Sequence, residues 1–151
     1  MNITDKVKVL AAPVCAECGV RLWNVEFKKE GSEFFLRIYI DKPGSGVAIT
    51  DCENVSRKID PILDEADPIE QSYYLEVSSA GLTRELCEDW HLDEFMGQEI
   101  ILSTYKSIDG RPKKINCTLA GYDNESLKAV YEGNEININR KDISKIVIDL
   151  L

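Results

Sequence analysis

Two cysteines, Cys15 and Cys18, form a C-x-x-C pair, a spacing used by thiol oxidoreductases and by half of a zinc site. Redox chemistry needs a lowered thiol pKa, which a helix N-terminus supplies. This pair falls instead in the last turn of a predicted helix, where the helix dipole disfavours thiolate. A zinc site needs about four ligands, and the remaining cysteines form no second pair. We therefore expect both thiols to pack in a core, with a thiol oxidoreductase as an alternative.

The only histidine, His91, lies among acids in the run CEDWHLDEF. A histidine general base needs a nucleophile and a pocket beside it. The chain has no G-x-S-x-G elbow, no P-loop and no glycine-rich dinucleotide motif. We predict that His91 lies on a helix surface and pairs with a carboxylate. We expect no catalytic residue, no cofactor, no metal and no enzymatic activity.

A cluster of cations surrounds the predicted turn Asp109-Gly110, with Tyr105 beside them. The cluster consists of Lys106, Arg111, Lys113 and Lys114. Basic and aromatic side chains on a loop can hold phosphates and stack on bases. The alternative is a polar hairpin tip that lysine keeps soluble. Arg57 also has two interpretations: it can bind a phosphate, or it can pair with Glu53 four residues earlier.

The run YYLEVSSAGLTREL, residues 73–86, changes character halfway. Its first half alternates like a half-buried strand, and its second half holds small residues and Gly81, which can adopt positive φ in a sharp turn. Leu82 is a lone large apolar residue in this turn, and Arg84 follows it. An apolar anchor and a guanidinium at a strand exit indicate a recognition surface or a domain junction. The alternative is an ordinary strand end, with Leu82 filling a core.

Two segments of the chain resemble signatures of the bacterial ribosome maturation factor RimP family, D-C-E-x-V-S-R and L-E-V-S-S-P-G-L-x-R-x-L. The chain matches them at Asp51, Cys52, Glu53, Val55, Ser56 and Arg57, and at residues 75–79, Gly81, Leu82, Arg84 and Leu86. It departs at Ala80 and Glu85, where the family commonly has Pro. These departures bear on the stiffness of the junction.

The resemblance implies a non-catalytic factor that binds the free small (30S) ribosomal subunit late in its maturation. It also implies contacts with small-subunit ribosomal protein twelve and with nearby 16S rRNA. The partner-binding residues it implies are Ser78, Ser79, Gly81, Leu82, Arg84, Asp51 and Arg57. The four cations around Asp109-Gly110 are candidate rRNA contacts. A general RNA chaperone with an Sm-like barrel is the alternative from another class.

Composition agrees with a factor that meets a basic partner. The chain has 151 residues and a net charge of −9, divided as −5 in residues 1–86 and −4 in residues 87–151. A free nucleic-acid binder is usually basic. An acidic factor on a ribosome more readily holds a basic protein, with local RNA contacts from a few clustered cations. Five cysteines, no signal peptide and no long apolar run lead us to expect a cytoplasmic protein away from membranes. We also expect a monomer.

The elements that position these residues form an α+β chain of two domains, 1–83 and 84–151. The first is an αββαβ unit with a three-stranded sheet. Its predicted elements are 4–18, 20–28, 34–40, a helix that begins at Thr50 and ends within the acidic run 60–70, and 73–78. We expect Thr4 to cap the first helix. We expect Thr50 and Glu53 to form a capping box at the start of the second. Its apolar stripe is Val55, Ile59, Ile62 and Leu63. Trp23, Val25 and Phe27 are placed on one face of the first strand.

The second domain holds a short helix within 85–95, followed by short strands at 98–104, 113–121, 126–131, 134–139 and 143–149. Turn signals at Asp109-Gly110, Asp123-Asn124 and Gly133-Asn134 separate the strands. About five short strands in so few residues favour a small barrel. The resemblance implies the same SH3-like, Sm-like barrel.

Overall fold

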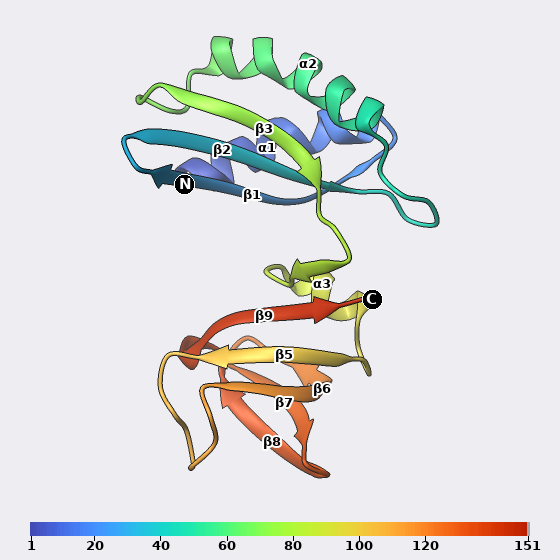
Figure 1. The fold of residues 1–151 in the computed structure, drawn as a ribbon, viewed down its shortest axis with the longest axis vertical. Helices are drawn as coiled ribbons and strands as arrows, with labels where there is room; N and C mark the ends of the chain where they lie inside the picture. The colour runs from blue at the N-terminus through green and yellow to red at the C-terminus, as the bar shows by residue number, and fades with distance from the viewer. Residues whose placement is uncertain (151) are drawn as a thin grey trace. The chain divides into compact units, whose positions relative to one another are not determined.

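The computed structural model describes residues 1–150, and the α+β class is confirmed (Figure 1). The chain forms two compact units that meet in the sequence between Gly81 and Leu82. Each unit has its own sheet and its own buried residues, so each is described separately. That they are independent folding domains, with a boundary after residue 83, stays a prediction.

The first unit has the predicted αββαβ order. Its elements are α1 (Ile3–Glu17), β1 (Arg21–Glu30), β2 (Glu33–Asp41), α2 (Ile49–Ala66) and β3 (Tyr73–Ser79). The sheet order is β1-β2-β3, with β1 antiparallel and β3 parallel to the central strand β2. Figure 1 shows both helices on one face of this sheet. The connection from β2 through α2 to β3 is the crossover that parallel strands require.

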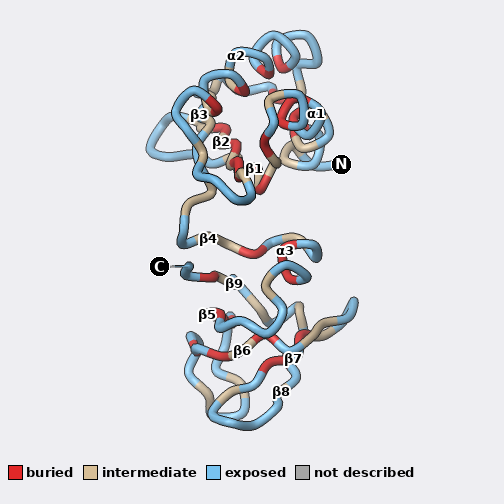
Figure 2. Tube along the Cα trace, turned by 90° about the vertical axis from the view of Figure 1, so that its right-hand side faces the viewer, coloured by how far each residue is buried: buried red, intermediate tan, exposed pale blue. Residues whose placement is uncertain are grey.

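The core of the first unit lies between this sheet face and the two helices (Figure 2). Its centre is formed by fully buried aliphatic side chains on β2 and α2, among them Leu36, Ile38, Ile40, Val55 and Ile59. Ile62, predicted in the α2 stripe, is 36% exposed, because the buried positions of the helix follow the spacing 51, 55, 59 and 63.

The predicted face of β1 is interrupted by a bulge. The register with β2 shifts between Leu22 and Asn24, so Trp23 is the extra residue. Leu22 therefore joins Phe27 against the core cluster, whereas Trp23 is buried outside it. The expected alignment of Trp23 with Val25 and Phe27 on one face is wrong for this reason.

Both predicted helix caps are also wrong. Helix α1 begins one residue earlier, with Asn2 as its N-cap; the Asn2 side chain accepts the backbone N–H of Asp5 at 2.8 Å. Helix α2 begins at Ile49 with Ala48 as its N-cap, so Thr50 lies inside the first turn and forms no box with Glu53. At the C-terminal end of α1, Gly19 has φ +75° immediately after the C-cap Cys18.

The second unit is a six-stranded antiparallel sheet with one short α-helix. Its elements are β4 (Thr83–Glu85), α3 (Asp89–Glu94), β5 (Glu99–Thr104), β6 (Lys114–Tyr122), β7 (Ser126–Tyr131), β8 (Asn134–Asn139), a 3₁₀ turn (Arg140–Asp142) and β9 (Ile143–Asp149). The strand order is β4-β9-β5-β6-β7-β8, consistent with a small barrel-like domain. Buried side chains on one face of β5, β6 and β7 form its core (Figure 2).

The predicted strands of this unit lie within one residue of the observed ones, but two local features differ. The segment 83–85 is a strand paired with β9, which the sequence did not predict, and the short helix predicted within 85–95 is α3. The turn between β7 and β8 is Glu132-Gly133, with φ of +50° and +79°, instead of Gly133-Asn134. Asp109-Gly110 forms a turn as predicted, with φ of +50° and +76°.

Candidate functional site

The turn after β3 is held by its own polar groups. The backbone N–H of Ala80 donates to the carbonyl of Ile40 at 2.8 Å, which extends the pairing of β3 with β2. Gly81 then takes φ +80°, and its N–H donates to Oγ of Ser79 at 3.1 Å. A side chain at position 81 would be strained at this φ. Ser79 and Gly81 therefore shape the exit of the strand, whatever else they contact.

Leu82 and Arg84 lie at the start of the second unit, on or beside the edge strand β4. Arg84 is opposite Ile148 of β9, and the Leu82 carbonyl accepts the N–H of Leu150 at 2.8 Å. The Leu82 side chain is 53% exposed, and Arg84 is half-buried. Backbone pairing thus fixes both residues in place, while most of the leucine side chain stays accessible to a partner.

The two sequence motifs converge on a groove between α2 and β3. We call it the α2–β3 groove; its walls are Ile49, Cys52, Glu53, Ser56 and Arg57 from α2 and Val77 from β3. Its volume is about 500 Å³ and it is open to solvent. The α2 residues recur every three or four positions, so they share one face of the helix. Neither motif alone predicts a groove; the crossover brings them together.

The groove is lined by apolar side chains, a thiol and two opposite charges, Glu53 and Arg57. Ile49 is 79% exposed, and burial, reinforced by Asp51, raises the pKa of the Cys52 thiol and keeps it neutral. The alternative pairing of Arg57 with Glu53 is not formed within residues 1–150, whereas the neighbouring Lys58 lies 3.6 Å from Glu17. Such a wall suits a peptide segment with both apolar and charged side chains.

Asp51, expected to bind a partner, is occupied within its own unit. Its Oδ2 accepts the backbone N–H of Ala48 at 2.9 Å and lies 3.6 Å from Nζ of Lys42. Asp51 is 9% exposed. It caps the first turn of α2, the role that the sequence assigned to Thr50. A carboxylate at the third helical position satisfies an amide that the helix leaves unpaired.

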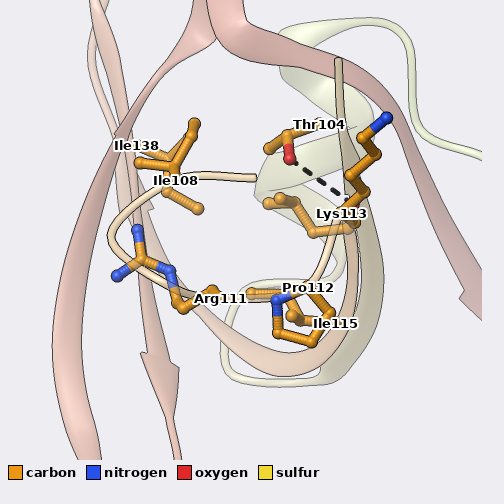
Figure 3. A pocket seen from close by; sticks show the side chains of 8 residues that line it. Thr104, Ile108, Arg111, Pro112, Lys113, Ile115 and Ile138 are labelled. Carbon is orange, nitrogen blue, oxygen red and sulfur yellow. Dashed lines mark hydrogen bonds between the residues drawn. The ribbon is translucent and has the colours of Figure 1, made fainter. Parts of the chain in front are cut away.

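The cationic side chains of the β5–β6 hairpin differ in how exposed they are to solvent and so to a partner. Arg111 is turned inward: its side chain is 16% exposed and lies 3.7 Å from Asp109. It lines a cavity of about 10 Å³ with Ile108, Pro112 and Ile138, room for one water at most (Figure 3). Thr104 donates its hydroxyl to the Lys106 carbonyl at 2.6 Å and fixes the base of the loop.

Three lysines of this hairpin face solvent. Lys106, Lys113 and Lys114 are exposed and carry no ion pair within the part of the chain that the structure describes. The 65% exposed Tyr105 accompanies them. The structure adds a fourth lysine, Lys145, which sequence reasoning missed. Ser103 of β5 is opposite Lys114 of β6 on one side and Lys145 of β9 on the other. Alternation along 143–149 indicates that Lys145 faces outward, but only the strand register places it on the same face as Lys114, with β5 between them.

Comparison with known families supplies the decisive observation for the first unit. Residues 10–83 match the family model of the RimP N-terminal domain. The resemblance to the RimP family is confirmed. RimP proteins are ribosome maturation factors and not enzymes. The match contains the whole α2–β3 groove and the turn as far as Thr83, and it ends where β4 begins.

The C-x-x-C pair does not resemble a redox site in this RimP-like chain. It lies at the C-terminal end of α1, and Cys15 is fully buried. Burial, with a smaller contribution from Cys18, raises the pKa of Cys15 to about 11, so the reactive thiolate is disfavoured. Within residues 1–150 no group of three or more His, Cys, Asp or Glu side chains is placed to hold a metal ion. These observations favour core packing over the oxidoreductase alternative.

The prediction for His91 is wrong. The side chain is fully buried, and its Nδ1 accepts the backbone N–H groups of Cys87 at 3.0 Å and Glu88 at 3.1 Å. His91 therefore caps the start of α3 from inside the fold and does not lie on a helix surface.

Proposed function

We propose that this chain binds the free 30S ribosomal subunit and assists its late assembly. The observation that carries the proposal is the RimP N-terminal domain match over residues 10–83, which includes the first motif, the second motif as far as Thr83, and the groove. The factor acts by holding and makes no covalent bond. It binds one state of the subunit better than another and so shifts the folding equilibrium of the subunit.

The partners we propose are a basic small-subunit protein, ribosomal protein twelve, and 16S rRNA close to it. The net charge of −9 supports a basic protein as the main partner, since both halves of the chain repel phosphate at long range. The exposed lysines Lys106, Lys113 and Lys114 support local contacts with rRNA. Leu82, Arg84 and Arg57 supply the remaining contacts in this proposal.

The proposed factor works in the bacterial cytoplasm as a monomer without a cofactor. None of the helices in residues 1–150 combines the length and the apolarity that crossing a membrane demands. Release follows when the mature subunit no longer offers the surface that the factor holds. Two small units joined by the turn at residues 79–82 suit a factor that holds its partner without chemical reaction.

The test is sedimentation of the purified chain through sucrose gradients with free 30S subunits and with joined 70S ribosomes. We expect co-sedimentation with the 30S subunit only. Binding to both particles, or to neither, would refute the proposal. A pull-down with and without RNase separates protein contacts from rRNA contacts.

A general RNA chaperone is the second candidate, and the exposed lysines with Tyr105 favour it. It requires binding to single-stranded RNA without any ribosomal protein, with affinity that falls steeply as salt rises. Titration of the chain with an unstructured RNA oligomer tests this candidate. Affinity similar to that for the 30S subunit would support the chaperone over the assembly factor.

A further inference from the structure

Strand β3 forms an open edge of the sheet in the first unit. Within residues 1–150 it pairs with β2 alone, and Figure 1 shows it as an outer strand. Proteins usually guard such edges with lysine, proline or a bulge. The sequence of β3, YYLEVSS, contains neither residue, and its register with β2 is unbroken. The opposite edge strand, β1, has a bulge at Trp23 and carries Lys28 and Lys29.

The hydrogen bond from Ala80 to Ile40 identifies the groups on the open edge. Because backbone groups alternate sides along a strand, the N–H groups of Glu76 and Ser78 point the same way as that of Ala80, toward β2. The N–H and C=O groups of Leu75, Val77 and Ser79 then point away from β2. They form a row of donors and acceptors to which another strand can bind.

The α2–β3 groove reaches β3 at Val77, one of the residues whose backbone groups point away from β2. A helix beside an exposed strand edge is the arrangement in which an extended peptide adds to a sheet, with backbone bonds to the strand and alternate side chains in the groove. Ile49 and Val77 offer apolar contact there. The exposed Ile49 side chain has no role in the core of its own unit, since it is not part of the core cluster.

The charge along α2 selects the kind of segment. Residues 60–70 contain five acids and no basic residue. Three of these acids lie near the start of β3: after burial, Asp64, Asp60 and Asp67 are the causes that raise the pKa of Tyr73. Phosphates would be repelled here, whereas lysine and arginine side chains would be attracted. The open edge and the acids together favour a basic protein segment over RNA.

We propose that an extended, basic segment of a ribosomal protein adds to the open edge of β3 as a fourth strand, with its alternate side chains in the α2–β3 groove. This inference rests on the proposed function, because the small subunit supplies the segment. It goes beyond that function in naming the binding mode, the edge and the chemistry of the ligand.

The experiment uses the full chain and purified free 30S subunits. Backbone amide hydrogen exchange is measured by mass spectrometry with fragmentation that separates individual amides of β3. We expect the amides of Leu75, Val77 and Ser79 to exchange at least ten times more slowly in the complex. The amides of Glu76 and Ser78, already directed at β2, should change little.

A pair of variants tests the groove independently. Ile49→Lys places a positive charge in the groove at an exposed position, and we expect at least tenfold weaker binding to 30S subunits. Val9→Lys makes the same change at a 60% exposed position on α1, and binding should stay within twofold of the unchanged chain. Circular dichroism checks that both variants are folded.

The outcomes separate this inference from the proposed function. A complex that forms with no change in exchange at Leu75, Val77 and Ser79 overturns strand addition and leaves the proposed function standing. Equal weakening by Ile49→Lys and Val9→Lys also overturns it. The same protection by protein-free 16S rRNA shows that the ligand is RNA and not a protein segment. No complex between the unchanged chain and the 30S subunit refutes the proposed function itself.

Discussion

Replacing Asp51 by alanine removes the cap of α2, and the structure allows the cost to be worked out. The loss of a side-chain cap to a backbone amide, here the 2.9 Å bond to Ala48, costs about 1 kcal/mol. The favourable position of a carboxylate in the first turn adds about 0.5 kcal/mol. The 3.6 Å pair with Lys42, whose side chain is 38% exposed, adds little. We expect the first unit to lose about 1.5 kcal/mol, or about 9 °C in its melting temperature.

The measurement is urea unfolding followed by tryptophan fluorescence in a Trp90→Phe background, so that the buried Trp23 reports on the first unit. Thr50→Ala is the matched control and should change the free energy of unfolding by less than about 0.5 kcal/mol. Asp51→Asn should fall between, since the amide oxygen can still accept the bond. If Thr50→Ala costs about 1 kcal/mol and Asp51→Ala costs nothing, α2 begins where the sequence pattern predicted, and the reasoning is wrong.

Three further predictions concern binding and thiol chemistry. Lys113→Glu with Lys114→Glu should weaken 30S binding and reduce the slope of log affinity against log salt by up to about two units, measured by titration at several salt concentrations. Cys15 should resist iodoacetamide in the folded chain at pH 8, because burial raises its pKa to about 11, and should react as the pH approaches that value or on unfolding. Leu82→Ala with Arg84→Ala should weaken 30S binding by more than about 2 kcal/mol, roughly thirtyfold, while the urea midpoint holds.

Each of these has an outcome that contradicts it. Lys6→Glu with Lys8→Glu makes the same charge change on α1, and an equal change in salt slope would show a nonspecific effect of charge. Rapid alkylation of Cys15 at pH 8 would mean that α1 opens in the native state. A collapsed midpoint with affinity preserved in the folded fraction would make Leu82 and Arg84 structural residues only.

The order of elements could be predicted because each carries its own periodic signal. Alternating apolar residues identified β2 and β3, and the spacing of Val55, Ile59 and Leu63 identified α2. The strands of the second unit were found for the same reason. The three-residue strand β4 was missed, since so short a segment has no period and exists only because β9 lies opposite it.

The errors at single residues share a physical cause, which is contact between residues that the local pattern does not contain. The bulge at Trp23 depends on the register with β2. His91 is buried because its ring accepts amides at the start of α3, a bond that no spacing rule contains. Lys145 shares a face of the sheet with Lys114 because Ser103 of β5 is opposite both residues. Strand register is therefore what the sequence lacked for the candidate rRNA-binding surface.

Helix α2 has a buried face and a groove face, and the residues of the first motif are divided between them. Asp51 and Val55 point inward, where one caps the helix and the other packs in the core. Glu53 and Arg57 point into the α2–β3 groove from the same few turns. Because helical spacing separates these two faces, substitutions on the first should lower stability and those on the second should lower affinity at constant stability. A sequence motif contains residues of both faces in one run. Only the packing of α2 on the sheet shows which of them stabilise the helix and which line the groove.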